Sequence, residues 1–546
     1  MAAPKGEGGM YPANLSESLF PARQDQPLRN LTIGDALREA AARWPDAEAL
    51  AEICGDGGIG RRWTFAALLA DSERLARALL TRFHPGERIC AWGPNTPEWV
   101  MLEFATAIAG LVLVTANPGL KAREIAYVLG QSGAVGLFAV REHRGNPLLA
   151  IAAEVARDLI ALREVTDMED PDALFAHAGP ERPVPDVAPV DPVQIQYTSG
   201  TTGFPKGVTL HHNGLLNNSR HHFTLANIAP GDRMLLMLPL FHTGGCALGM
   251  LGGLQLGCCT FLLRQFDPQV ALRIAQSEGI AAFLGVPTML QAIAEVHEAD
   301  PRPLPALHTV GSGGSMVPPE LVRDITRRFD CTFVIVYGQT ESSPLLTMTR
   351  HGDDRDKACE TVGRPMPHLD LAIFDLATGG IAALGEQGEI RARGYALMLG
   401  YHENPEATAA AIDTDGWLHT GDIGTMDAEG FVRVTGRVKE MIIRGGENLF
   451  PAEIENVLLE HPDVAEVAVV GVPDQRLGEA VAAFVRPVPG RRMDEAALFA
   501  HCRGQMAAQK TPAHWIEVSE WPLTGSGKIQ KFELRRQWEE ARAVPA

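Results

Sequence analysis

Short apolar segments without polar alternation recur in the first third of the chain, with helical stretches between them. Residues 87–93, 111–116 and 134–140 are predicted to be strands, and residues 97–110 show helical periodicity. Strands of this kind must be covered on both faces, which is typical of a parallel sheet with helices on each side. We therefore expect an α/β fold, with a second region of the same kind at residues 234–336.

The 546 residues are too many for one ordinary core, so at least two domains are expected. After residue 363, short strands separated by Gly and Asp turns predict a small β-rich subdomain. Residues 437–546 then show a strand, loop, helix and strand pattern, long enough for a small α+β domain. The prediction is a large N-terminal domain of layered α/β subdomains at residues 1–436, followed by this C-terminal domain.

The net charge and the cysteine pattern limit the kinds of binding partner and the cellular compartment that we expect for this protein. A net charge of −19 argues against nucleic acid as the main partner. The eight cysteines include no CxxC pair, which fits reduced thiols, and we expect Cys258 and Cys259 to be small apolar residues of a buried strand. The first residues resemble no targeting segment, and no apolar run reaches the roughly 18 residues of a membrane span. We expect a cytoplasmic protein.

The segment TSGTTGFPKG, residues 198–207, follows an apolar strand and combines glycines, small hydroxyl residues and one lysine. Backbone N–H groups near glycines, together with an ammonium group, match the fixed dipoles and charge that a polyphosphate needs. The segment lacks the P-loop pattern. Taken alone, an ordinary surface hairpin explains it equally well.

Further strings occur downstream in a fixed order: LPLFHTGG (238–245), GSGGS (311–315), YGQTE (337–341), TGD (420–422), GRVKEMIIRGGENLFPAEIE (436–455) and PLTGSGKIQK (522–531). With the glycine-rich loop, they resemble those of the adenylate-forming enzymes in identity, order and spacing. The resemblance covers residues 30–540 and is strongest to the medium-chain acyl-CoA ligases. It implies an enzyme that joins a carboxylic acid to AMP, releases pyrophosphate, and transfers the acyl group to CoA.

The resemblance also implies a set of ATP-binding residues. The β- and γ-phosphates would be held by Thr198, Ser199, Gly200, Thr201, Thr202, Gly203 and Lys206. The adenine and α-phosphate would contact Gly313, Gly314, Ser315, Tyr337, Gly338, Gln339 and Thr340. Glu341, with Thr201, would hold Mg²⁺, Asp422 would bind the ribose, and Arg437 would reach the ribose or a phosphate. A core role for Tyr337, a solvated loop for Glu341 and a simple turn for Asp422 are the alternatives.

The C-terminal domain is expected to be mobile. Lys439 would be the hinge, and rotation about it would bring Gly445, Gly446 and Glu447 to the CoA site after adenylation. Before that rotation, Lys528 would bridge the attacking carboxylate and the α-phosphate. The alternative for Lys528 is one more solvated lysine.

His242 lies where the resemblance places a residue between the acyl pocket and the reacting carboxylate, and a core histidine is the alternative. The Gly- and Ala-rich residues 245–257 leave room for an uncharged chain. The doublets His211–His212 and His221–His222 lack Cys or carboxylate partners at ligand spacing. They are expected to be solvated or to lie on a helix surface.

Several alternatives stay open. An aliphatic acid of medium length is the first expectation and an aryl acid the second. The acceptor is expected to be CoA, with a carrier-protein phosphopantetheine as the alternative, and a non-catalytic nucleotide-binding scaffold is the least favoured. A homodimer is compatible with the sequence.

Replacing Lys528 tests the electrostatic part of this interpretation. Lys528→Ala should slow adenylate formation about 100-fold or more, the size expected for loss of a charge-stabilising donor. Transfer of the acyl group from preformed acyl-AMP to CoA should suffer far less. Pyrophosphate exchange and single-turnover acyl transfer measure the two steps, and equal losses in both would reject the assignment.

Overall fold

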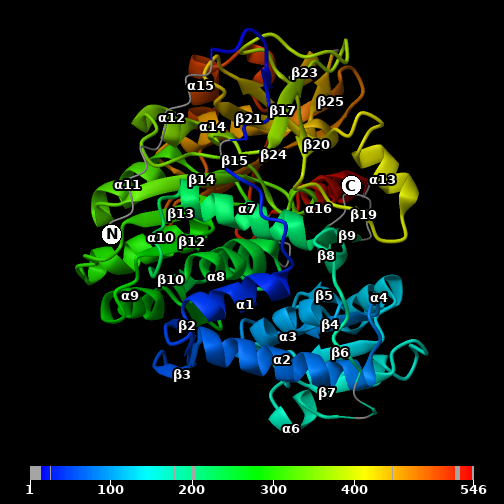
Figure 1. Cartoon of the computed structure of the whole chain (residues 1–546). Coiled ribbons are helices and arrows are strands. Elements are labelled where there is room, and N and C mark those ends of the chain that lie inside the picture. Colours follow the sequence, from blue (N-terminus) through cyan, green and yellow to red (C-terminus); the bar gives the residue numbers. More distant parts are fainter. Residues whose placement is uncertain are drawn as a thin grey trace.

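The computed structural model describes residues 14–24, 26–177, 179–180, 182–198, 205–445, 447–522 and 529–543. Within these ranges no helix is both long and apolar enough to cross a membrane. The described strands form four sheets, and Figure 1 shows the sheets of the large N-terminal part with their helices.

The first sheet contains the parallel strands predicted near the N-terminus, in the order β19-β9-β8-β5-β4-β6-β7. Strands β8, β5, β4, β6 and β7 pair in parallel, and β9 and β19 are antiparallel additions at one edge. Its strands are β4 (Arg88–Trp92), β5 (Val112–Ala116), β6 (Gly136–Ala139), β7 (Glu164–Asp167), β8 (Pro192–Thr198), β9 (Lys206–His211) and β19 (Gly400–Tyr401). Its helices are α2 (Phe65–Arg82), α3 (Pro97–Ile108), α4 (Ala122–Ser132), α5 (Leu148–Val155) and α6 (Pro171–Leu174).

The second sheet has the order β16-β15-β14-β13-β12-β10-β11-β2-β3, with a parallel centre and antiparallel strands at both edges. Its strands are β2 (Glu48–Ile53), β3 (Ile59–Thr64), β10 (Arg233–Leu236), β11 (Cys259–Leu263), β12 (Ala282–Gly285), β13 (Thr309–Gly313), β14 (Thr332–Gly338), β15 (Leu345–Met348) and β16 (Arg364–Pro365). The helices around it are α1 (Ile33–Arg43), α7 (His212–Leu225), the π-helix η1 (Gly244–Leu251), α8 (Gly252–Leu256), α9 (Pro268–Ser277), α10 (Pro287–Ala299), α11 (Pro319–Phe329) and α12 (Arg355–Glu360).

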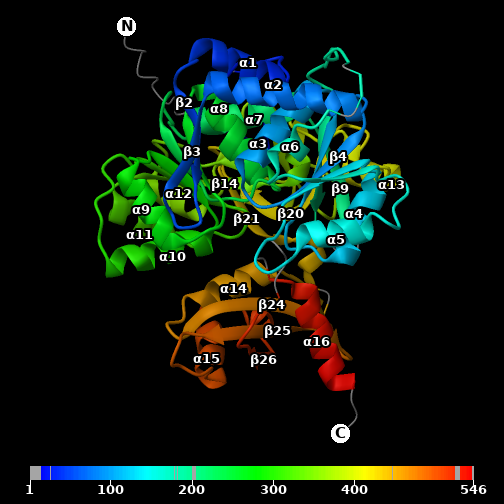
Figure 2. The same ribbon diagram turned by 90° about the horizontal axis from the view of Figure 1, so that it is seen from below.

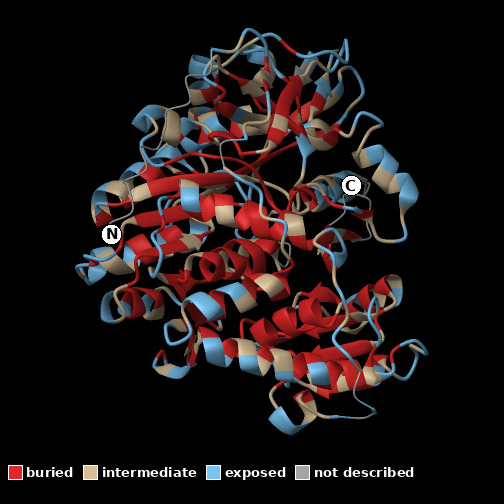
Figure 3. Cartoon of the chain, viewed as in Figure 1, coloured by how far each residue is buried: buried red, intermediate tan, exposed pale blue. Residues whose placement is uncertain are grey.

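Helices α1, α3, α7 and α8 form a layer between these two sheets (Figure 1). Helix α3 shows why: from Trp99 to Ile108 every residue is buried, as expected for a helix that is apolar all round. Figure 3 shows the same concentration of buried residues along the strands and the inner helices. Cys258 and Cys259 are 1% and 4% exposed at β11, which confirms their prediction as residues of a buried strand.

The third sheet is the predicted β-rich subdomain. It is antiparallel throughout, in the order β1-β17-β18-β20-β21. Its strands are β1 (Leu19–Phe20), β17 (Leu369–Phe374), β18 (Gly388–Gly394), β20 (Leu418–Met426) and β21 (Val432–Arg437). Helix α13 (Pro405–Ala411) precedes β20 and the 3₁₀ turn η3 (Val438–Glu440) follows β21, whereas the 3₁₀ turn η2 (Thr340–Ser342) joins β14 to β15 in the nine-stranded sheet.

The C-terminal domain has its own sheet and two apolar clusters, and Figure 2 shows it as a separate unit beneath the larger body. Strand β25 pairs with β22, β24 and β26. The elements are β22 (Ile442–Arg444), β23 (Glu447–Leu449), α14 (Pro451–Leu459), β24 (Val464–Asp474), β25 (Gly478–Pro487), α15 (Glu495–Gln505), the 3₁₀ turn η4 (Ala508–Lys510), β26 (His514–Glu517) and α16 (Lys531–Ala543). The mixed α/β and α+β fold class is confirmed.

The last helix is tied to the segment that joins the two parts of the chain. Lys531 Nζ lies 2.8 Å from Glu440 Oε2, in η3, and 2.8 Å from Glu455 Oε1, in α14. These two carboxylates hold the pKa of Lys531 above its ordinary value although burial opposes the shift. The start of α16, only three residues beyond Lys528, is therefore anchored beside the predicted hinge residue Lys439.

The expectation for the histidine doublets was wrong in one respect. His211, His212, His221 and His222 are all buried, from 0% to 6% exposed, at the start and end of α7. Burial lowers the pKa of His222 to about 4 and of His221 to about 3, so these rings are neutral packing groups. In the described residues no group of three or more His, Cys, Asp or Glu is arranged to hold a metal ion.

A buried polar network joins α3, β8 and the π-helix. Gln194 Nε2 donates to Glu103 Oε1 at 2.7 Å, Gln196 Nε2 donates to Gln194 Oε1 at 2.8 Å, and the Cys246 thiol donates to Gln194 Oε1 at 3.6 Å. Glu103 is 1% exposed, and burial raises the pKa of its carboxyl group to about 8. A protonated carboxylic acid therefore lies inside the helical layer, two hydrogen bonds away from Gln196.

Because Glu103 has a higher pKa in the folded chain than its ordinary value near 4.5, the folded state binds the extra proton between about pH 4.5 and pH 8. Its contribution to stability is present at low pH and is lost as the pH rises through that window. Glu103→Gln keeps the acceptor oxygen and removes the titration.

The melting temperature of Glu103→Gln minus that of the wild type should therefore grow as the pH rises from 5 to 8, by on the order of a few degrees. The measurement is thermal unfolding across that range. Glu154→Gln, an exposed change on α5, is the control and should show a constant difference. A constant difference for Glu103→Gln as well would contradict a buried proton at this residue.

Candidate active site

Tyr337, Asp422 and Arg437 come together where β14 of the nine-stranded sheet faces the β-rich subdomain. The Tyr337 hydroxyl donates to Asp422 Oδ2 at 2.8 Å, and Arg437 Nε lies 2.9 Å from Asp422 Oδ1. Residues 422 and 437 are direct cross-strand partners in β20 and β21. Strands β20 and β21, together with Tyr337 of β14 in another sheet, thus hold the carboxylate of Asp422. Asp422 is only 5% exposed.

The charges in this group support one another. Burial raises the pKa of Asp422 while Arg437 and the Tyr337 hydroxyl oppose that shift, and the charge of Asp422 raises the pKa of Arg437. Burial, followed by the charge of Asp422, raises the pKa of Tyr337, so the phenol remains a donor. Each carboxylate oxygen keeps a lone pair after these contacts. We propose that these lone pairs receive the ribose hydroxyls.

The predicted adenine loop follows β13 directly. A Cβ atom on Gly313 would lie 2.2 Å from the carbonyl oxygen of Val336, so no side chain fits there. Gly314 has φ +79°, a left-handed conformation that glycine adopts without strain, and its neighbour Ser315 is exposed. The backbone is therefore bare and accessible beside Tyr337, as a flat ligand would require.

The ends of the predicted phosphate loop lie opposite each other in the β8–β9 hairpin. Thr198 and Lys206 are cross-strand partners, and residues Ser199, Gly200, Thr201, Thr202 and Gly203 lie outside the described residues. A polar cavity of about 150 Å³ adjoins Lys206, with Tyr127, Gln131 and Tyr401 among its other lining residues. We propose that Lys206 contributes its positive charge to the triphosphate from this wall.

Glu341 fits a magnesium ion that is shared with phosphates. Its carboxylate is 9% exposed and accepts a hydrogen bond from the Tyr401 hydroxyl at 2.8 Å, while Gln339 and Thr340 precede it at the start of η2. Mg²⁺ takes oxygen ligands and needs only one or two carboxylates where phosphates supply the rest. We propose Glu341 as the protein carboxylate for that ion. Thr201, the second predicted ligand, lies outside the described residues.

His242 precedes the π-helix η1 and is half-buried. Its carbonyl oxygen accepts from Gly245 N at 2.9 Å and from Cys246 N at 3.1 Å, and its ring centroid lies 4.4 Å from that of Phe241. A π-helix is wider than an α-helix and is frequent at functional sites. These backbone hydrogen bonds thus fix His242 just before η1, and later residues of η1 line an apolar cavity.

The predicted CoA residues belong to the C-terminal domain. Gly445 has φ +62° and its N–H donates to Leu477 O at 2.7 Å, and Glu447 is exposed at the start of β23. Gly446 and Lys528 lie outside the described residues. The residues that would act in the second half-reaction are therefore carried by a different domain from Tyr337 and Asp422, and their roles remain proposals.

Two features near the site were not predicted from the sequence. Tyr401 contacts both Glu341 and Lys206, but it belongs to none of the strings that pointed to the reaction. The network from Glu103 to Cys246 draws on three separate segments, and only the position of Glu103 on an apolar helix could have signalled a buried acid. Both depend on pairings between distant segments.

Comparison with known families agrees with this arrangement. A model of the AMP-binding enzyme matches residues 37–402, and a model of the AMP-binding enzyme C-terminal domain matches residues 453–528. The fold and the site thus define an adenylate-forming enzyme, which excludes the scaffold alternative. The chain belongs to the AMP-binding enzyme family, and the resemblance to the adenylate-forming enzymes that the sequence indicated is confirmed.

Individual relatives cover nearly the whole chain. The mitochondrial medium-chain acyl-CoA ligase ACSF2 of Rattus norvegicus is 36% identical over 561 residues, covering 96% of this chain and 90% of the relative. ATP-bound MatB from Rhodopseudomonas palustris superposes with a TM-score of 0.83 at 27% identity, covering 94% of this chain and 100% of MatB. The anthranilate CoA ligase AuaEII, solved with anthranoyl-AMP, gives 0.84 at 25% identity, covering 95% and 99%.

Proposed function

We propose that this enzyme is an ATP-dependent acid–thiol ligase that activates a medium-chain aliphatic acid and transfers it to CoA. In the first step a carboxylate oxygen attacks the α-phosphorus of ATP, the bond to the β-phosphate breaks, and pyrophosphate leaves. In the second step the thiolate of CoA attacks the acyl carbon and AMP leaves, while the thiol proton passes to solvent. Similarity to the medium-chain acyl-CoA ligase over most of the chain supports this reaction.

The first step brings an anion to a polyanion, so its barrier is largely electrostatic. Lys206 and Lys528 would supply positive charge, and the Tyr337–Asp422–Arg437 group would fix the nucleoside. Mg²⁺, held by Glu341, would neutralise the phosphate oxygens. The hydrogen bond and salt bridge of the Tyr337–Asp422–Arg437 group exist without ligand, and such preorganised polar groups lower a barrier of this kind.

The second step needs a different set of residues near the acyl carbon. We propose that the C-terminal domain turns about Lys439, so that residues 445–447 replace Lys528 beside the acyl-AMP. The salt bridges of Lys531 to Glu440 and Glu455 tie α16 to η3 and α14, so the start of this helix would move with the segment that carries the hinge.

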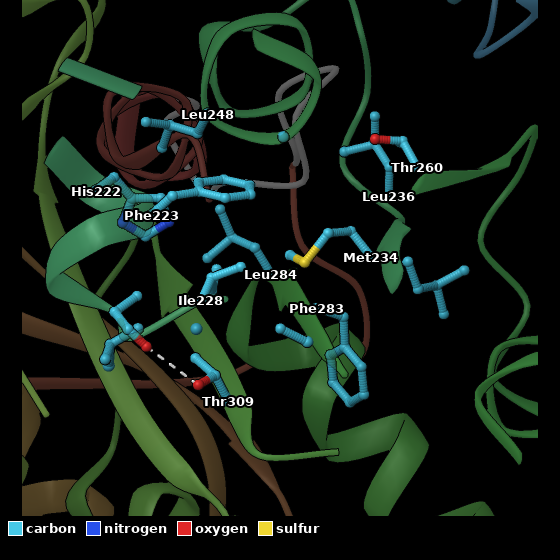
Figure 4. Close-up of a pocket in the computed structure, with 16 residues that line it drawn as sticks. His222, Phe223, Ile228, Met234, Leu236, Leu248, Thr260, Phe283, Leu284 and Thr309 are labelled. Atoms are coloured by element: carbon cyan, nitrogen blue, oxygen red, sulfur yellow. Dashed lines mark hydrogen bonds between the residues drawn. The ribbon is translucent and has the colours of Figure 1, made fainter. Parts of the chain in front are cut away.

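One observation carries the choice of an aliphatic acid: an apolar cavity extends from the π-helix to the strands of the nine-stranded sheet. Figure 4 shows Leu248, Phe223, Met234 and Leu284 around it, and Gly311 of β13 also lines it. Among the described residues that line it there is no Asp, Glu, Lys or Arg, so a charged chain end would be desolvated there without one of these partners.

The cavity is small as it stands. Its volume of about 30 Å³ holds about two water molecules, so side chains must move before an acyl chain enters. Met234 lies in its wall, and Met, with three rotatable bonds, adapts more easily than branched residues. The cavity therefore marks the path of an acyl chain, and opening it would be coupled to substrate binding.

An aryl acid is the second candidate, supported by the similarity to the anthranilate CoA ligase. An aryl ring in the same cavity would be shorter and wider than an aliphatic chain. A carrier-protein phosphopantetheine is the alternative acceptor to CoA. Direct comparison of free CoA with a loaded carrier protein separates these acceptors.

The function is tested by ATP–pyrophosphate exchange with a panel of acids, from butyrate to dodecanoate and including benzoate and anthranilate. We expect exchange to be fastest with an aliphatic acid of about eight to ten carbons, followed by thioester formation with free CoA. Fastest exchange with benzoate or anthranilate would replace the aliphatic assignment by the aryl one. Absence of exchange with every acid would overturn the proposal.

Gly249 provides a test of the acyl path. It lines the cavity, and a Cβ atom there would lie 2.4 Å from Leu236 Cδ1, so Gly249→Ala should push Leu236 into the cavity. The ratio of kcat/KM for decanoate to that for butyrate should fall about tenfold, since one methylene changes such ratios by at least this factor.

Gly130→Ala in helix α4 is the control, because a Cβ atom there would meet Leu159 Cδ2 at 3.8 Å, an ordinary contact, and Gly130 does not line the cavity. It should keep the wild-type ratio. If both variants retain the wild-type chain-length profile, the acyl chain binds elsewhere.

A further inference from the structure

Tyr401 lies at a junction of three subdomains. It ends β19, the edge strand of the seven-stranded sheet, which the chain reaches after leaving β18 of the β-rich subdomain. In β19, Tyr401 is the cross-strand partner of Val208 in β9, two residues from Lys206. Just before it, Met398 N donates to the carbonyl oxygen of Glu341 at 2.8 Å. The segment thus bridges the phosphate-loop hairpin and the residue predicted to hold the metal.

The Tyr401 side chain makes the same connection. Its hydroxyl donates to Glu341 Oε1 at 2.8 Å, and Lys206 Nζ lies 4.7 Å from the centroid of its ring. The first contact is a charge-assisted hydrogen bond, and the second is within the range of a cation–π interaction. One neutral side chain therefore contacts an anion through its edge and a cation through its ring.

We propose that Tyr401 is a positioning residue for adenylate formation: its hydroxyl orients the Glu341 carboxylate toward the metal, and its ring holds the Lys206 ammonium toward the triphosphate. The proposal rests on the proposed function for its reaction. Because Tyr401 fixes Oε1 of the Glu341 carboxylate, the second oxygen, Oε2, would be available to the proposed metal ion. Hydrogen bonds of this kind to ligating carboxylates commonly set metal affinity.

The phenol suits this task chemically. Its hydroxyl carries a hydrogen that it donates to the Glu341 carboxylate, which can only accept when it is ionised. A phenylalanine would keep the ring face for Lys206 but could not donate to the carboxylate.

The strand itself is held independently of this side chain. Tyr401 N donates to Thr408 Oγ1 at 2.9 Å, Leu399 N donates to Thr209 O at 2.9 Å, and His402 N donates to Gly207 O at 2.7 Å. These backbone bonds remain when the hydroxyl is removed. A change in metal binding without a change in folding is therefore the expected signature.

The test uses Tyr401→Phe in the full-length protein, with Mn²⁺ as the probe. Electron paramagnetic resonance of free Mn²⁺ gives its affinity for the enzyme–ATP complex, and equilibrium dialysis in EDTA gives the affinity for metal-free ATP. We expect Tyr401→Phe to weaken Mn²⁺ binding about tenfold, the size seen when such supporting partners are removed, and to leave metal-free ATP binding unchanged. Tyr401→Leu should weaken both, with about a threefold loss for metal-free ATP.

Tyr395→Phe is the control. Tyr395 is a half-buried tyrosine of the same connecting segment whose hydroxyl lies 3.2 Å from His221 Nδ1. It should bind Mn²⁺ as the wild type does. Wild-type Mn²⁺ affinity in Tyr401→Phe, or an equal loss in Tyr395→Phe, would overturn the proposal. A wild-type enzyme that binds Mn²⁺ and ATP but exchanges pyrophosphate with no acid would instead reject the proposed function alone.

Discussion

The charged groups that we propose to bind one ATP molecule are distributed over three sheets, and contacts between the sheets fix their relative positions. Lys206 begins β9 of the seven-stranded sheet, Glu341 follows β14 of the nine-stranded sheet, and Asp422 lies in the β-rich subdomain. Asp422 and Glu341 are only 5% and 9% exposed, so each carboxylate needs polar partners. Their joint value comes from hydrogen bonds that cross between sheets, from Tyr337 to Asp422 and from Tyr401 to Glu341.

The parts predicted correctly from the sequence are those that local physics determines. Apolar strands such as Val112–Ala116 are buried at every residue, and the helical periodicity of residues 97–110 corresponds to helix α3 (Pro97–Ile108). The small β-rich subdomain and the separate C-terminal domain follow from turn spacing in the same way. The cross-strand pairing of Asp422 with Arg437 was not predicted, because nothing in either local segment specifies its partner.

The errors and omissions have a different origin. The histidine doublets were judged from polarity, yet α7 is packed between the sheets and buries them as neutral rings. Glu103 looked like an ordinary helix residue, and its partners on β8 and in the π-helix lie 91 or more residues away in the chain. Tyr401 has the same character, since its contacts with Glu341 and Lys206 join distant segments. Long-range contacts of single polar side chains leave no periodic trace in a sequence.

The positions of these omitted groups bear on how the site responds to its substrates. Gln196, in the network of Glu103, is two residues before the end of β8, where the phosphate loop begins, and Cys246 of the same network is the third residue of the π-helix. That π-helix also contributes Leu248 and Gly249 to the apolar cavity. A shift of η1 that opens the cavity for an acyl chain would therefore pull on hydrogen bonds that lead to the phosphate loop. In a close-packed core such a displacement is transmitted to neighbouring side chains, so we expect a movement of η1 to reach Gln196 in β8 through its hydrogen bond to Cys246.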